Sequence, residues 1–166
     1  MTDEKAQLLQ RLEHAHNTVR GLLADIDTQA TIYPGWTLKQ LIAHFTGWDD
    51  AVTASLHAHA VGNEPAAPAV EGIDPYNAVS VATREALSFE QTVQEWELAR
   101  EQLKAAVRDL PLQKFAEPLL FPWGKTGSVA QLLAIFYEHE EEHVEEIHQH
   151  LAQLAAQKSE SEKIIL

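Results

Sequence analysis

Three segments of the chain open with the same helix-capping pattern, a hydroxyl residue followed three positions later by glutamine. The pattern occurs at residues 37–40, 88–91 and 128–131. In such a capping box the hydroxyl accepts a hydrogen bond from the amide of the glutamine, while the glutamine side chain binds the amide of the hydroxyl residue. Each box precedes apolar residues at helical spacing, so the three boxes predict three helix starts.

Apolar spacing predicts a fourth helix at the N-terminal end and sets the length of the other three. Residues 3–27 repeat leucine, valine and isoleucine at intervals that follow the 3.6-residue period of an α-helix. The other helices are predicted over residues 38–61, 89–109 and 129–156. Because no segment has a strand pattern, the predicted fold class is all-α.

The connections between these helices differ in length, which bears on how the helices are arranged. Residues 33–35 break the first connection with proline and glycine, whereas a long second connection follows residue 61 and is predicted to hold a short helix over 75–85. A chain that crosses along a bundle needs a long connection. We therefore predict a four-helix bundle with one long crossover between the second and third helices. Residues 1–156 form its single domain, and residues 157–166, which lose the periodicity, form a C-terminal tail.

The charge of the chain and its lack of cysteine limit the possible chemistry. The net charge is -13, and the 12 basic residues are scattered, so we expect neither a nucleic-acid partner nor binding to anionic membranes. Without cysteine, any metal must be held by nitrogen and oxygen. The sequence carries no secretory signal pattern and no run of the roughly 20 apolar residues that cross a bilayer. A cytoplasmic location is the default expectation.

Residues 137–150 combine four histidines with six glutamates, and their helical positions separate candidate metal ligands from solvated residues. His139 and His143 lie one turn apart on the apolar side of the predicted helix, so both side chains can reach one ion. His150 lies about two turns beyond His143, too far to share that ion, and His148 points to the opposite side.

The second predicted helix supplies a third candidate ligand. His44 lies at the edge of that helix's buried stripe, a position that can face a cavity between helices. Bundle metal sites are assembled from inward side chains of facing helices. With His139 and His143 it would give three neutral imidazoles and leave a position for water or a substrate atom, as catalytic metal sites do. A core histidine bound to a backbone carbonyl is the alternative for His44.

His139, Glu140 and His143 also match the HExxH pattern of zinc proteases. In a helix so rich in glutamate the second position is often glutamate by composition alone. The residues that extend the pattern in metzincins are missing, and no predicted strand is present to hold a peptide. We therefore do not favour a protease.

Side chains near the three histidines are candidates for pocket walls or for orienting a ligand. The aromatic candidates are Trp36, Trp48, Trp123 and Phe136. Core packing is the simpler interpretation of Trp48 and Phe136. Glu140 and Asp49 are candidates for orienting a ligand imidazole, although Asp49 could instead face solvent.

Two segments that carry the candidate histidines resemble the DinB-like (DinB/YfiT-like) superfamily. Residues 36–48, WTLKQLIAHFTGW, are similar to the tryptophan-and-histidine opening of its second helix, and residues 138–147, EHEEEHVEEI, are similar to its fourth-helix histidine pair. The resemblance implies a four-helix bundle, often a homodimer, that holds zinc or nickel with one histidine of the second helix and two of the fourth. His44, His139 and His143 match those positions.

The resemblance also implies two classes of function. Bacillithiol transferases and mycothiol-dependent maleylpyruvate isomerases belong to the superfamily, and in them the metal is thought to activate a thiol. Our leading hypothesis is therefore a metal-dependent enzyme that activates a low-molecular-weight thiol or water for reaction with a small electrophile, in stress response or detoxification. The second hypothesis, suggested by the protective ClbS/DfsB group, is a non-catalytic bundle that sequesters a reactive small molecule. A metal-free dimeric bundle with ordinarily bonded histidines is the third.

Overall fold

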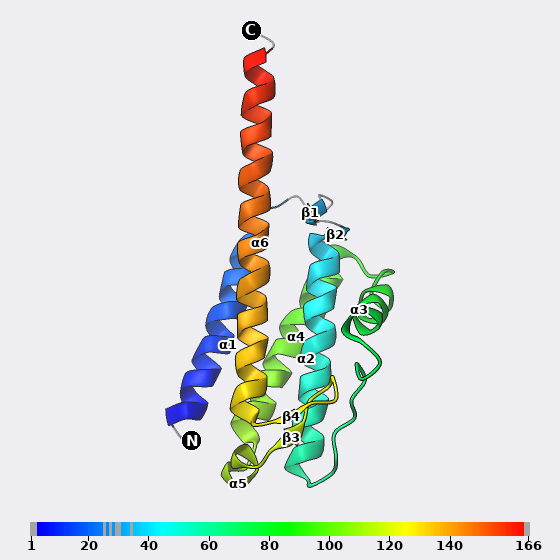
Figure 1. The fold of residues 1–166 in the computed structure, drawn as a ribbon, viewed down its shortest axis with the longest axis vertical. Helices are drawn as coiled ribbons and strands as arrows, with labels where there is room; N and C mark the ends of the chain where they lie inside the picture. Colours follow the sequence, from blue (N-terminus) through cyan, green and yellow to red (C-terminus); the bar gives the residue numbers. More distant parts are fainter. Residues whose placement is uncertain (1–2, 25, 27, 29–30, 34, 165–166) are drawn as a thin grey trace.

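The structure is a computed structural model that describes residues 3–24, 26, 28, 31–33 and 35–164. Within them, six α-helices follow one another along the chain (Figure 1). They are α1 (Asp3–Leu22), α2 (Leu38–Ala60), α3 (Ile73–Ala82), α4 (Phe89–Asp109), α5 (Leu112–Ala116) and α6 (Val129–Ile164). None of these helices is both long enough and apolar enough to cross a membrane.

The four long helices α1, α2, α4 and α6 form the bundle, and α3 lies in the long connection, packed against α2 (Figure 1). The most extensive packing joins α2 with α4 and α1 with α6. The prediction of an all-α fold with four long helices and a long connection between the second and third is confirmed.

All three predicted capping boxes form. Thr37 Oγ1 accepts a hydrogen bond from the Gln40 amide at 3.3 Å, and Gln40 Oε1 accepts one from the Thr37 amide at 2.8 Å. The same reciprocal pair occurs over residues 88–91 and 128–131. These local bonds explain why α2, α4 and α6 begin where the sequence predicts.

Two predicted helix ends are wrong, for related reasons. α1 ends at Leu22 and not near residue 27, yet Leu22 and Ile26 are both buried in the core. The apolar spacing therefore continues past the helix because Ile26 also packs in the core, and Gly21 weakens the end of the helix. Conversely, α6 continues past residue 156 to Ile164 (Figure 1). Loss of apolar spacing did not end that helix, because polar residues also form helices. The tail as a separate unit stays a prediction.

The prediction of no strands is wrong in detail, because two very short hairpins occur. They pair β1 (Thr31–Tyr33) with β2 (Trp36–Thr37) and β3 (Leu119–Leu120) with β4 (Thr126–Gly127). Strands of two or three residues are too short to show alternation. In the second hairpin Gly124 has φ +84°, which favours glycine, and its amide bonds to Phe121 O at 2.9 Å.

The bundle core consists of two apolar clusters with a polar layer between them. On α6 one cluster ends at Tyr137 and the other begins at Val144, so His139, Glu140 and His143 lie between them. On α4 Arg100 lies between Trp96 of one cluster and Leu103 of the other, and on α1 His16 lies between Ala15 and Val19 in the same way. The candidate site belongs to this polar layer.

Candidate metal centre

The structure brings the three predicted histidines together. The Nε2 atom of His139 lies 3.4 Å from His44 Nε2 and 2.9 Å from His143 Nε2. One possible ligand atom from each of the three imidazoles lies within 4.8 Å of the other two. His44 is only 2% exposed, and the other two are partly buried. Three nitrogens from two helices thus converge on one point.

Burial keeps these imidazoles neutral at physiological pH. Desolvation lowers the pKa of His44 to about 3, and repulsion from His139 and His143 adds to this effect. Desolvation, with repulsion from His143, lowers the pKa of His139 to about 4, against the opposing effect of nearby glutamates. Desolvation also lowers the pKa of His143 to about 4. A neutral imidazole offers a lone pair, which is the form that binds a metal ion.

Glu146 fixes the orientation of one of the three rings. His143 Nδ1 lies 3.2 Å from Glu146 Oε2, one turn further along α6. Because an ionised carboxylate only accepts hydrogen bonds, the Nδ1 atom donates, and the lone pair of His143 is on Nε2, facing the cluster. Metal-binding histidines are commonly oriented by such a carboxylate. This role of Glu146 was not predicted from the sequence, although its i, i+3 spacing from His143 was a usable signal.

The donor set fits a divalent ion of the late transition series. Three neutral imidazole nitrogens suit zinc and nickel, and leave room for a further ligand. Without an ion, adjacent Nε2 atoms can satisfy one another only by sharing a proton, because each neutral ring carries one proton on its two nitrogens. His44, His139 and His143 are therefore the residues that would hold a metal.

Asp49 and Glu140 have a partner that the sequence did not predict, and their role in orienting an imidazole stays a prediction. Both carboxylates bind the guanidinium of Arg100 on α4. The alternative of a solvent-facing Asp49 is wrong, because this side chain is fully buried. Arg100 was not predicted from the sequence, where its only signal was a charged residue on the buried stripe between Trp96 and Leu103.

The remaining histidines of α6 lie outside the cluster, as predicted. His148 is exposed. The His150 ring nitrogen Nε2 donates to the carbonyl oxygen of Thr31 at 3.2 Å. This bond attaches α6 to the first hairpin and leaves His150 away from the three converging nitrogens.

A small cavity of about 280 Å³ opens directly onto the histidine cluster, because His139 forms part of its wall. Its other walls include Trp48, Trp123, Ile135, Phe136, Glu138 and Glu142. Trp48 and Phe136 are nearly buried, so they are core residues and pocket walls at once. The Trp123 ring contacts the Trp48 ring, with centroids 5.9 Å apart. Three of the four aromatic candidates, Trp48, Trp123 and Phe136, therefore lie around this cavity, whereas Trp36 does not line it.

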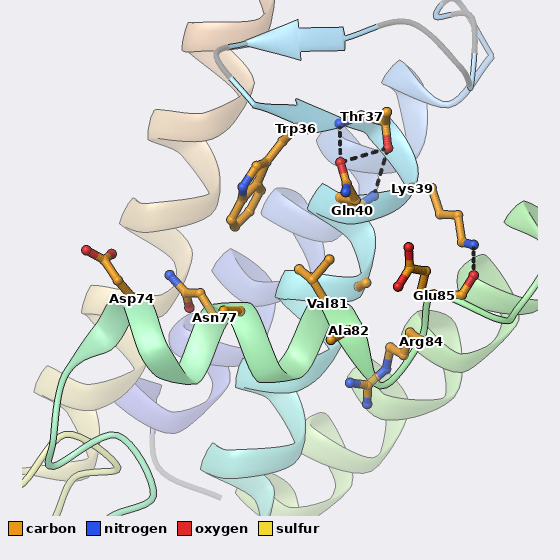
Figure 2. Close-up of a pocket in the computed structure, with 12 residues that line it drawn as sticks. Trp36, Thr37, Lys39, Gln40, Asp74, Asn77, Val81, Ala82, Arg84 and Glu85 are labelled. Atoms are coloured by element: carbon orange, nitrogen blue, oxygen red, sulfur yellow. Dashed lines mark hydrogen bonds between the residues drawn. The ribbon is translucent and has the colours of Figure 1, made fainter.

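A larger cavity of about 580 Å³ lies between the start of α2 and α3 (Figure 2). Figure 2 shows the Trp36 ring of β2 on one side of this cavity and Asp74 and Asn77 of α3 on the other, while the Gln40 side chain bonds to Thr37. None of the three histidines lines this cavity, although the Trp36 ring meets the His44 ring edge-on at 4.8 Å between centroids. The smaller cavity is therefore the one that gives a ligand direct access to the cluster.

Comparisons with known proteins agree with this architecture. The sequence profile of the family described as mycothiol maleylpyruvate isomerase N-terminal domain matches residues 6–140. Two solved structures share the fold, mycothiol-dependent maleylpyruvate isomerase and its variant with one histidine replaced by alanine, at 17% and 16% identity and a TM-score of 0.73. These matches cover 89% of this chain and only 63% of each solved chain. No curated protein sequence matches the chain.

Proposed function

Because the chain belongs to the mycothiol maleylpyruvate isomerase N-terminal domain family, and through it to the DinB-like superfamily, we propose that it is a metal-dependent enzyme. The proposed reaction joins a low-molecular-weight thiol, or water, to a small electrophile. The observation that carries the proposal is the convergence of the Nε2 atoms of His44, His139 and His143 beside a cavity. A zinc or nickel ion held there would act as a Lewis acid and lower the pKa of the thiol or water.

The chain's own residues would bind and orient the electrophile. Trp48, Trp123 and Phe136 supply apolar and aromatic surface next to His139, as binding pockets for small molecules commonly do. Glu138 and Glu142 line the same cavity and add negative charge to it. We therefore expect neutral or cationic electrophiles to react faster than anionic ones of similar size, because the two carboxylates repel an anion.

A sequestering protein is the second candidate function. It is supported by the His139 cavity, whose 280 Å³ suits a small molecule. In that role the aromatic walls would hold a reactive molecule without turnover. A homodimer and a cytoplasmic location stay predictions of the sequence.

Turnover distinguishes the two candidates. Zinc-loaded and nickel-loaded protein would be mixed with a neutral aryl halide and with each of several thiols, among them a sugar-linked cysteine and glutathione, and product formation would be followed over many equivalents. We expect catalytic turnover that a His44→Ala variant of unchanged helical content loses. Binding of the electrophile at about one equivalent per chain, with no turnover for any thiol or water, would contradict the enzyme and favour sequestration.

A further inference from the structure

A fully buried arginine joins the two helices that carry the histidines. Arg100 of α4 and its partner Asp49 of α2 have no exposed side-chain surface, and its second partner, Glu140 of α6, is only 2% exposed. Burying three charged groups is costly unless each is closely paired. Each of these three buried side chains therefore needs close partners of opposite charge.

The guanidinium of Arg100 binds both carboxylates in a bidentate manner. Its Nε and Nη2 atoms donate to the two oxygens of Asp49 at 2.9 and 3.0 Å. Its Nη1 atom donates to Glu140 Oε2 at 2.9 Å, and its Nη2 atom also donates to Glu140 Oε1. The Nη1 atom makes a longer contact of 3.5 Å with the carbonyl oxygen of Leu12 on α1. A planar fork with fixed donors is needed for this pairing, which lysine does not provide.

The two carboxylates are placed next to the histidines along their helices. Glu140 directly follows His139 on α6, and Asp49 lies five residues after His44 on α2. Holding both carboxylates on one rigid plane fixes the rotation and the rise of α2 relative to α6. A metal site needs its ligands held within about 0.5 Å and 10–20° of the binding geometry. Small slippage between these helices would separate His44 from His139.

We propose that the clamp formed by Asp49, Arg100 and Glu140 positions His44 and His139 for metal binding. The inference rests on the proposed function, since it assumes that the three histidines bind a metal. Stability alone does not explain the clamp, because apolar side chains of similar volume often replace a buried ionic group without loss of stability. Arg100 acts here as a positioning residue and not as a ligand.

The decisive variant removes the clamp and keeps the core filled: Arg100→Met with Asp49→Leu and Glu140→Leu. Helical circular dichroism and the unfolding transition check its fold. Zinc affinity is measured by competition with a chelator, and the visible absorption of bound cobalt(II) reports the ligand geometry. We expect the zinc dissociation constant to rise about 10–100-fold, the range seen when groups that support metal ligands are lost, with an altered cobalt spectrum.

Two single variants and a control sharpen the result. Arg100→Lys keeps the charge and loses the fork, so we expect weaker zinc binding from it as well. Glu140→Gln keeps the shape of the clamp and weakens one pairing. If the triple variant does not fold, a rise of about tenfold in the zinc dissociation constant of Glu140→Gln supports the clamp. A Glu140→Gln variant that binds zinc as tightly as the parent overturns it.

The control is Lys5→Met. It removes a buried cation that binds the carbonyl oxygens of Arg108 and Leu110 at 2.7 and 2.6 Å, and it should leave zinc affinity unchanged.

The outcomes separate this inference from the proposed function. A parent protein that binds no zinc overturns the proposed function and the inference with it. A parent that binds zinc, together with a folded triple variant of equal affinity and identical cobalt spectrum, overturns the inference alone. A loss of affinity in Lys5→Met equal to that in Arg100→Lys would also overturn it, because general destabilisation would then explain both.

Discussion

Two clusters in this molecule gather possible metal ligands equally closely, and they differ in charge. His44, His139 and His143 form one, and Glu13, His16 and Glu101 form the other, each with ligand atoms within 4.8 Å of one another. In the second cluster the ammonium of Lys104 binds both carboxylates. The first consists of neutral imidazoles. Closeness of possible ligand atoms is therefore not enough to identify a metal site. A cation of the protein, such as the Lys104 ammonium, can already occupy the position that a metal ion would take.

The histidines of the two clusters share burial and differ in partner. Desolvation lowers the pKa of His16 to about 4, much as it lowers that of His44. His16, however, lies 3.2 Å from a carboxylate oxygen of Glu97 and edge-on to the Trp96 ring. His16 thus has a carboxylate and an aromatic ring beside it, although neither of its ring nitrogens makes a hydrogen bond. The Nε2 atoms of His44, His139 and His143 face one another, an arrangement in which a bound cation is the natural partner.

The largest expected effect comes from removing a ligand of the first cluster. His139→Ala should weaken zinc binding by more than about 100-fold, because loss of a ligand costs more than loss of its supporting groups. His16→Ala should leave zinc affinity at the parental value. Chelator competition on both variants measures the difference. Equal losses would show that the two clusters cannot be distinguished by charge.

Bound zinc should stabilise the parent protein through the first cluster. At a free zinc concentration about 100 times the dissociation constant, binding adds roughly 2.7 kcal/mol. For a chain of this size that raises the melting temperature by about 5–10 °C. The measurement is thermal unfolding with and without zinc, and His139→Ala should show no rise. A rise of the same size in that variant would indicate binding elsewhere.

Without metal, acid should destabilise the protein through both clusters. The pKa values of His44, His139, His143 and His16 fall to about 3 or 4 in the folded chain, whereas unfolded histidine titrates near 6.5. Between those values the unfolded state binds more protons, so the free energy of unfolding falls as pH drops from about 6.5 to 4.

Each histidine contributes to this slope by at most about 1.4 kcal/mol per pH unit. Replacing the three histidines of the first cluster by glutamine should therefore reduce the change of unfolding free energy with pH more than His16→Gln does. Urea unfolding of the metal-free proteins across this pH range gives the two slopes. Identical slopes in the parent, the triple variant and His16→Gln would contradict the claim that burial lowers the pKa of these histidines.

The smallest expected effect tests the role of Lys104. Lys104→Met removes the cation from the second cluster and should change stability by about 1 kcal/mol or less, because its ion pairs reach the surface. It should allow a second, weaker zinc ion to bind at Glu13, His16 and Glu101. Calorimetric titration counts the ions. A variant that still binds only one would show that removing the competing cation is not sufficient.

Local sequence signals predicted most of the fold and the three histidines. Capping boxes placed the starts of α2, α4 and α6, and the four-residue spacing of His139 and His143 placed both on one helix face. The position of His44 at the edge of a buried stripe made it a candidate third ligand, and the family resemblance then matched it to the other two, since residues about 95 positions apart share no local pattern. Arg100 could not be assigned, because its partners become neighbours only when α2, α4 and α6 pack together. For the same reason the sequence did not show that Asp49 and Glu140 bind this arginine.

X-ray absorption at the metal edge, on tag-free protein purified without chelator and incubated with zinc or nickel, tests the central claim most directly. We expect about one ion per chain, with three imidazole nitrogens at roughly 2.0–2.1 Å for zinc, and loss of that ion in a His139→Ala/His143→Ala variant. Absence of bound metal after both incubations, or an ion held by carboxylates and retained in the double variant, would contradict it.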